Sequence, residues 1–140
     1  SAILDLKDKS IISYAMGRNN NNQLVFDTFD LAVSKYPDAH PIFHSDRGFQ
    51  YTSKQFKTRL NKVGMIQSMS RVGRCIDNGP MEGFWGILKC EMYYLGKFKD
   101  YDNLVAAIEQ YIYFYNYERR QKKLNKISPM TYRQLIENAA

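Results

Sequence analysis

The sequence predicts an α/β domain with a mixed β-sheet flanked by α-helices. The chain has 140 residues, of which 44% are hydrophobic and 24% charged, and this composition is typical of one globular domain. Segments rich in β-forming residues come first, helical patterns lie between them, and helical patterns alone fill the C-terminal part. We therefore expect one domain over residues 1–140.

Two features indicate the compartment. The chain has no apolar run near the roughly 20 residues that cross a bilayer, and its N-terminus does not resemble a secretory signal. Two cysteines are too few for a secreted disulfide framework. We expect a cytoplasmic protein with reduced thiols and no membrane partner.

The first elements are a hairpin and a helix. Residues 2–6 and 11–16 are apolar runs separated by the polar turn 7–10, which predicts a β-hairpin. Because a strand begins at the second residue, we expect that a preceding element has been cut away. Four asparagines at 19–22 can cap the next helix, which should end before Pro37.

The middle of the chain predicts two more strands around a helix. Residues 41–45 are expected to form a short buried strand with Asp46 at its carboxyl end. A capping-box pattern at 52–55 starts a helix whose buried stripe is Phe56, Leu60 and Val63, and Gly64 closes it. Residues 65–69 form the next predicted strand, and residues 70–79 a mobile loop.

The remaining elements are helical. A helix should begin at Asn78 and Pro80, and residues 101–117 and the segment after Ser128 repeat the helical pattern. The stripe predicted to face the core on the first of these helices consists of Met81, Trp85, Leu88 and Met92.

Positive charge is concentrated in the C-terminal part. Residues 1–50 contain five basic and six acidic residues, whereas residues 51–140 contain fifteen and eight. A polyanion is therefore an expected partner, with a solvated basic surface as the alternative. The densest group, predicted to bind phosphate, is Arg119, Arg120, Lys122, Lys123 and Lys126.

Two carboxylates are candidates for metal chemistry. Asp46 should end a strand and Glu82 should lie in the first turn of a helix, with 35 residues between them. Converging carboxylates are the ligands that Mg²⁺ or Mn²⁺ requires, and with a third carboxylate they can hold two metals for phosphodiester displacement. Taken singly, Asp46 could instead be a turn residue, and Glu82 could simply interact favourably with the helix dipole.

Three motifs make the chain recognisable. They are His44-Ser45-Asp46-Arg47-Gly48-Phe49-Gln50-Tyr51, Ser68-Met69-Ser70-Arg71, and the run Asp77-Asn78-Gly79-Pro80-Met81-Glu82-Gly83-Phe84-Trp85-Gly86-Ile87-Leu88-Lys89. Together with Tyr115-Asn116-Tyr117-Glu118-Arg119-Arg120, they resemble the catalytic core of bacterial insertion-sequence transposases of the retroviral-integrase-like group. The resemblance covers nearly the whole chain.

This resemblance implies an RNase H-like fold and an Asp-Asp-Glu (DDE) metal triad that cuts and joins DNA strands. Asp46 would be its second member and Glu82 its third, with Lys89 holding DNA seven residues later on the same helix face. The first Asp should lie on a strand ahead of the hairpin, so we expect the fold to lack its first strand here. We interpret Asp5 as structural and expect the fragment to be inactive.

The resemblance also implies the partners. They are transposon-end and target DNA, with Mg²⁺ or Mn²⁺ as cofactor, a homo-oligomer as the assembly and no small-molecule substrate. Two other readings remain open: a nuclease that acts on RNA–DNA hybrids, and a catalytically dead DNA-binding or self-association module. A zinc site built from His40, His44, Cys75 and Cys90 is disfavoured because their spacing fits no compact finger.

Overall fold

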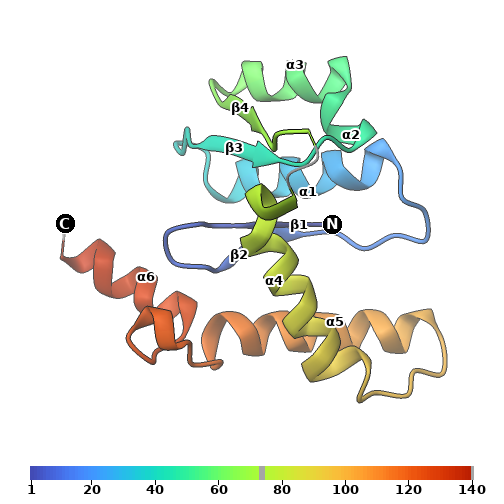
Figure 1. Ribbon diagram of the computed structural model, residues 1–140, viewed down its shortest axis with the longest axis vertical. Helices are drawn as coiled ribbons and strands as arrows, with labels where there is room; N and C mark the ends of the chain where they lie inside the picture. Colours follow the sequence, from blue (N-terminus) through green and yellow to red (C-terminus); the bar gives the residue numbers. More distant parts are fainter. Residues whose placement is uncertain (73–74, 140) are drawn as a thin grey trace. The chain divides into compact units, whose positions relative to one another are not determined.

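The computed structural model describes residues 1–72 and 75–139. The chain divides into two units, drawn in Figure 1. Unit 1 comprises residues 1–3 and 13–82, and unit 2 comprises residues 4–12 and 83–140. The prediction of one domain over 1–140 stays a prediction. Within the described ranges, no helix is both long and apolar enough to cross a membrane.

The predicted hairpin is confirmed. Strands β1 (Ala2–Leu4) and β2 (Ile11–Tyr14) form a two-stranded sheet. The amide of Asp5 donates to the carbonyl of Ser10 at 2.9 Å, near the turn. The Asp5 and Asp8 side chains accept hydrogen bonds from backbone amides inside this turn, at 2.7 Å from Lys7 and 2.8 Å from Ser10. These bonds hold the turn in shape without a glycine.

A second pair of strands organises unit 1. Strands β3 (Ile42–Ser45) and β4 (Ile66–Met69) pair in parallel, with Ile42 opposite Ile66 and Ser45 opposite Met69. Parallel neighbours need a crossover connection, and helices α2 (Phe49–Thr52) and α3 (Lys54–Lys62) supply it (Figure 1). The prediction of a buried β3 is wrong at its amino end, where Ile42 is 66% exposed.

The strand pairs differ from the expected single sheet. The mixed α/β character is confirmed, but the described strands form two separate two-stranded sheets. The expectation that a first strand is missing stays a prediction.

Phe56 of α3 is the centre of the core of unit 1. Its side chain is fully buried, and its ring contacts four others, those of Phe26, Phe29, Phe43 and Tyr51, at centroid distances of 5.2 to 6.3 Å. These rings come from α1 (Asn22–Lys35), α2 and β3. Edge-to-face and offset contacts of this kind add to the burial of apolar area, so one residue joins the crossover helix to the strand and to α1.

Helix caps agree with the sequence except at one residue. Asn21 caps α1 by accepting from the amide of Leu24, as the asparagine run predicted. Helix α3 is capped by Ser53, which accepts from the amide of Phe56 at 3.2 Å, and not from Thr52 as the capping box predicted. The reason is that Thr52 already ends α2. Gly64 follows α3 with φ of +68°, a left-handed conformation that favours glycine.

Helices make up most of unit 2. A 3₁₀ turn, η1 (Cys75–Asn78), leads into α4 (Gly79–Leu88), which starts in unit 1, and α4 is followed by a π-helical turn, η2 (Lys89–Tyr93). After these come α5 (Tyr101–Tyr117), the 3₁₀ turn η3 (Lys122–Leu124) and α6 (Pro129–Asn138). The predicted span of 101–117 and the Ser128 cap are confirmed. Residues 73–74 of the loop predicted to be mobile lie outside the described residues.

The core stripe of α4 differs from the prediction. Phe84 and Leu88 are buried, and the Phe84 ring packs edge-on against Tyr115 of α5 at 4.9 Å between centroids. Met81, Trp85 and Met92 are only half-buried. Leu88 is buried as predicted, but Phe84 and not Trp85 packs against Tyr115. For Met92, the wider π turn that begins at Lys89 changes the angular position from that of a continuous α-helix.

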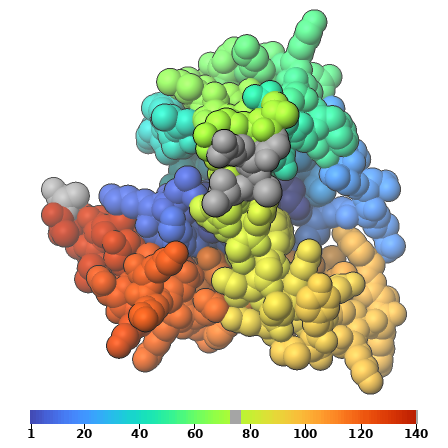
Figure 2. Space-filling view, viewed as in Figure 1, coloured from blue at the N-terminus to red at the C-terminus, as the bar shows by residue number. Residues whose placement is uncertain are grey.

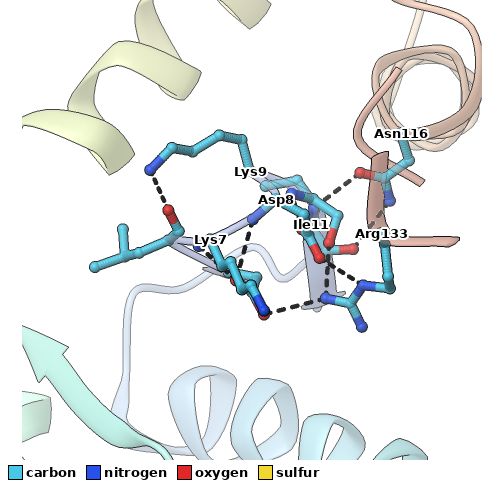
Figure 3. A network of polar contacts seen from close by, with 9 residues as sticks. Lys7, Asp8, Lys9, Ile11, Asn116 and Arg133 are labelled. Atoms are coloured by element: carbon cyan, nitrogen blue, oxygen red, sulfur yellow. Dashed lines mark hydrogen bonds and ion pairs between the residues drawn. The ribbon is translucent and has the colours of Figure 1, made fainter. Parts of the chain in front are cut away.

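A buried charged network fixes the hairpin turn within unit 2 (Figure 3). The Arg133 guanidinium donates to Asp8 at 2.6 Å, to Asp5 at 3.1 Å and to the hydroxyl of Ser10 at 3.2 Å. Asp8 is 2% exposed and Arg133 is 8% exposed, so each charge depends on the other for compensation.

Asn116 makes a second attachment to the same turn. Its side-chain oxygen accepts from the amide of Ile11 at 2.8 Å, and its side-chain nitrogen donates to the Ile11 carbonyl at 2.9 Å. The amide thereby imitates a neighbouring strand, and the hairpin turn is held by residues more than 100 positions away in sequence.

Replacing Arg133 with methionine should strongly destabilise unit 2. The variant retains most of the side-chain volume but leaves the buried Asp8 carboxylate without its cation, a change that typically costs about 3–5 kcal/mol. Urea unfolding followed by circular dichroism measures this cost, with the exposed Arg120→Met as control. A loss below about 1 kcal/mol for Arg133→Met would show that the network does not hold the turn.

Candidate functional site

The candidate site lies at the carboxyl ends of β3 and β4. In open α/β sheets ligands bind beyond these ends, because successive loops there leave from the same edge. Asp46 follows β3 directly and Ser70 follows β4, and the Ser70 amide continues the ladder by donating to the Ser45 carbonyl at 2.9 Å. The parallel pairing therefore brings two sequence motifs to one edge.

Asp46 is exposed at this edge. Its Oδ1 accepts from the Gly48 amide at 2.8 Å, a turn interaction that orients the carboxylate. Among the described residues its Oδ2 has no hydrogen-bond partner. Asp46 is thus a turn residue in this structure, and its role as a metal ligand stays a prediction.

The Asp46 carboxylate approaches Gly48 closely. A Cβ on Gly48 would lie 3.0 Å from Oδ1 of Asp46 and 3.1 Å from the side-chain oxygen of Gln50, so these two side chains would have to shift by a few tenths of an ångström. The φ of Gly48, −54°, is ordinary for any residue, so the backbone conformation does not require glycine. Tyr51 stands nearby, and burial, followed by the charge of Asp46, raises the pKa of its phenol.

Ser70 connects the site residues of both strands. Hydrogen bonds join the His44 ring to the hydroxyls of Ser68 at 3.0 Å and Ser70 at 3.3 Å. The Nε of Arg47 donates to the Ser70 carbonyl at 2.9 Å. No separate role for Ser70 was predicted from the sequence, although the pattern Ser-x-Ser-Arg at residues 68–71 could have indicated one.

An ion pair closes the loop ahead of α4. Arg71 donates to the carboxylate of Asp77 through its backbone amide at 3.0 Å, its Nε at 3.0 Å and its Nη2 at 2.8 Å. The hydrogen bond from the Arg71 side chain holds the pKa of Asp77 far below its usual range. The pair therefore ties the end of β4 to the residues that precede Glu82.

Glu82 is exposed in the first turn of α4 and is the last residue of unit 1. It has no hydrogen-bond partner within the described part of the chain, and the helix dipole favours its charge at this position. Asp46 and Glu82 thus lie in one unit, and their oxygen donors suit Mg²⁺ or Mn²⁺. The described residues include no group of three His, Cys, Asp or Glu side chains that could hold a metal.

Other residues considered from sequence have structural partners. The Asp5 carboxylate accepts from Lys7 and Arg133, which supports its interpretation as a structural residue. The His40 ring lies 2.8 Å from the Val63 carbonyl, and Cys90 is an exposed free thiol.

The basic residues expected to bind DNA lie in unit 2. Lys89 is exposed and is the first residue of η2, and Arg120, Lys122, Lys123 and Lys126 are exposed as well. Glu82 is the last residue of unit 1, whereas Lys89 belongs to unit 2. The expectation that Lys89 lies on the same helix face as Glu82 therefore stays a prediction.

Arg119 differs from its basic neighbours because it is already paired. Its Nε donates to both carboxylate oxygens of Glu91, at 2.8 Å and 3.1 Å, and its Nη2 donates to one of them at 2.5 Å. The Tyr111 hydroxyl donates to the same carboxylate at 2.8 Å. The Arg119 hydrogen bond lowers the pKa of Glu91, and burial raises that of Tyr111. Neither Glu91 nor Tyr111 was predicted as a partner, because their separation in sequence leaves no periodic signal.

Comparison with known proteins identifies the family. Residues 1–75 and residues 82–135 each match the family described as "Integrase core domain". The chain belongs to the integrase core domain family. Asp46 lies in the first matched region, and Glu82, Lys89 and the basic residues 119–126 lie in the second, so the resemblance noticed in the sequence is confirmed.

Several curated proteins are similar to this integrase core. An "Uncharacterized transposase-like protein" of Haemophilus influenzae is 41% identical over 95% of the chain and 62% of its own length. The "Putative transposase InsK for insertion sequence element IS150" of Escherichia coli is 38% identical over 95% of the chain and 47% of its own length. An IS600 protein of Shigella sonnei is 39% identical over all of the chain and 52% of its own length. The chain thus spans about half to three fifths of these relatives.

The Arg71–Asp77 pair predicts an acid-shifted titration. Because Arg71 depresses the folded pKa of Asp77, the carboxylate should stay ionised well below pH 3.8, its ordinary value. Its stabilising effect is present above that pH and disappears only as pH falls through the depressed pKa. Carbon-detected NMR titration of the Asp77 carboxyl measures this, and Arg71→Gln should return the midpoint toward 3.8. Equal midpoints in both proteins would contradict the pairing.

Proposed function

We propose that this chain is the catalytic core of a DDE-type DNA transposase. It would act in metal-dependent DNA strand cleavage and strand transfer. The observation that carries the proposal is the exposed Asp46 carboxylate at the carboxyl end of a parallel strand, in the same unit as the exposed Glu82. The integrase core match and the transposase names of the relatives support it. DNA would be the substrate, and a homo-oligomer would be the working assembly.

Asp46 and Glu82 are the residues proposed to hold Mg²⁺ or Mn²⁺. Such ions activate a nucleophile and neutralise charge on the leaving oxygen in phosphodiester displacement. In the chain itself, Gly48 and its amide orient Asp46, and the Arg71–Asp77 pair positions the start of α4 and so supports Glu82. Lys89 and the exposed basic residues of 120–126 would hold the DNA backbone.

The reaction consists of two in-line displacements at phosphorus. In the first, a water oxygen attacks the phosphorus, the P–O3′ bond breaks, and the O3′ leaves with a proton as a free 3′-hydroxyl. In the second, the oxygen of that 3′-hydroxyl attacks a phosphodiester of another strand and forms a new P–O3′ bond. The P–O3′ bond of the attacked strand breaks, and its O3′ departs. Because both steps have the same geometry, one site serves both.

A third carboxylate is needed for a two-metal site. Since the described residues bring no three metal-binding side chains together, we propose that the first Asp comes from the longer protein and that residues 1–140 alone are inactive. Mn²⁺ titration of this chain, compared with a chain extended upstream by about 30 residues, addresses this point.

A catalytically dead DNA-binding or self-association module is the second candidate. It is favoured by the same lack of a three-ligand group among the described residues. Such a module would retain its fold and its basic surface but would not join strands in any length of chain.

Asp46→Asn and Glu82→Gln should each abolish DNA joining by the full-length protein. Losing one metal carboxylate removes several kcal/mol of transition-state stabilisation, which corresponds to a loss of roughly 10³-fold or more. A strand-transfer assay with labelled transposon ends and Mg²⁺ measures the effect.

Asp38→Asn and Glu109→Gln are matched controls for this experiment, because both residues are exposed and lie outside the proposed site. Joining at the normal rate by either site variant would exclude the metal role. No joining by the unmodified full-length protein would favour the dead module.

The pairing of Arg119 predicts unequal roles within the basic segment. Lys122→Gln with Lys123→Gln should lower the slope of log K against log salt for duplex DNA by about 1.8, because each phosphate contact contributes about 0.9. Arg119→Gln should leave the slope nearly unchanged, because Glu91 already neutralises that charge. Fluorescence anisotropy between 50 and 200 mM salt measures both slopes. A fall of about 0.9 for Arg119→Gln would show that the arginine leaves Glu91 to bind phosphate.

A further inference from the structure

The stretch between Asp46 and Asp77 has an unusual charge pattern. Residues 47–76 contain seven basic residues and no acidic residue. The seven are Arg47, Lys54, Lys57, Arg59, Lys62, Arg71 and Arg74. Six of the seven lie within residues 51–140, the part that carries the excess of positive charge.

The arginines of this stretch that the structure describes are engaged within the fold. Arg47 donates to the Ser70 carbonyl, and Arg71 pairs with Asp77. Arg59 pairs with Asp30 at 2.6 Å and also lies over the ring of Phe26, 4.5 Å from its centroid. Arg74 lies outside the described residues. Of the described residues in this stretch, the three lysines have no ion-pair partner, and Arg47, which is exposed and bonded to an uncharged carbonyl, also keeps its charge.

Lys54, Lys57 and Lys62 share the outer face of α3. All three are exposed and, among the described residues, none has an ion-pair partner. The residues between them on this face are polar and exposed as well: Gln55, Thr58 and Asn61. The opposite face is anchored by the buried Phe56 and Leu60, so the helix is held firmly while its lysines project into solvent. In Figure 2 the atoms of α3, coloured green, lie at the surface of the molecule.

A merely solvated helix face is expected to carry mixed charges. Acidic residues three or four positions from a lysine relieve repulsion on such faces, and α3 has none, not even in its first turn where a carboxylate would favour the helix dipole. Asp30, the nearby carboxylate on α1, is paired with Arg59. The lysine charge is thus left without an internal partner.

We propose that the outer face of α3 binds the phosphate backbone of duplex DNA. This inference rests on the proposed function, in which the chain acts on DNA. Lys54 and Lys62 are eight residues apart, or about 12 Å along the helix, and duplex DNA carries one phosphate charge per about 1.7 Å of its axis. Because this density counts both strands, and each strand carries one phosphate per about 3.4 Å, the face spans roughly three to four phosphates of one strand. Its short polar residues can add hydrogen bonds to phosphate oxygens.

This surface differs from the basic segment 119–126 in its place and in its selectivity. It belongs to unit 1, the unit that contains Asp46 and Glu82, whereas the C-terminal segment belongs to unit 2. Lysines bind phosphate as point charges and read no base edges. The α3 face should accordingly bind duplex DNA of any sequence.

The test compares two triple variants in the full-length protein. Lys54→Gln, Lys57→Gln and Lys62→Gln remove the α3 charges, whereas Lys7→Gln, Lys97→Gln and Lys99→Gln remove three exposed lysines elsewhere with the same change in net charge. For a random-sequence duplex, the α3 variant should lower the slope of log K against log salt by about 2.7, or 0.9 for each contact. The control should change it little. Equal slopes in the two variants would overturn the proposal.

Three further measurements sharpen the result. Replacing the same three residues with arginine should restore binding, because charge and not shape is required, and circular dichroism should show all variants folded. Competition with polyglutamate is the third measurement. If polyglutamate displaced the bound duplex as effectively as unlabelled DNA of equal charge does, the surface would bind acidic polymers in general, and the proposal would fail.

The catalytic proposal and this inference fail separately. Asp46→Asn should lose strand transfer and retain duplex binding, whereas the α3 variant should lose both. If strand transfer is absent from the unmodified protein but binding depends on α3, the inference stands without the catalytic function. If strand transfer proceeds normally in the α3 variant at physiological salt, the inference is wrong and the function stands.

Discussion

The parallel pairing of β3 with β4 is the constraint on which the candidate site depends. It puts the carboxyl ends of the two strands at one edge, so that Ser70 contacts His44 at the strand end that carries Asp46, although residues 47–69 lie between Asp46 and Ser70 in sequence. Parallel pairing in turn requires the α2–α3 crossover. Phe56 of α3 holds that crossover against β3 and α1 through ring contacts on several sides. The helix that carries the lysine face is therefore also the one that contributes the most buried large side chain of unit 1.

Unit 2 has a different kind of organising interaction. Its hairpin turn is short and polar and could not be held by apolar burial alone. Arg133 and Asn116 compensate the charges and backbone groups of this turn from α6 and α5. Buried polar groups are costly unless they are paired, so these contacts make the turn and the two C-terminal helices depend on one another.

Arginine and lysine divide the positive charge of the protein into two roles. Arg47, Arg59, Arg71 and Arg119 make directed contacts inside the fold, consistent with a planar guanidinium that can donate in several directions at once. Lysines on α3 and in the segment 122–126 keep their charge at the surface, and Arg120 is an exposed arginine that does the same. The basic surface available to a polyanion is therefore smaller and more localised than the net charge of +6 indicates.

The sequence by itself determined the hairpin, the caps at Asn21 and Ser128, the span of α5 and the membership in the integrase core family. These features depend on local patterns: alternation, helical periodicity, capping chemistry and contiguous motifs. The motifs also identified Asp46 and Glu82 as the carboxylates of interest.

Only the tertiary structure decided which charges are free and which are used. The pairings of Arg119 with Glu91 and of Arg133 with Asp8 join residues that no periodicity relates. The tertiary structure also decided that Phe84 and not Trp85 is buried, because Tyr115 packs against it. Burial and ion pairing depend on what other segments of the chain bring to a residue, and a local pattern contains no information about those segments.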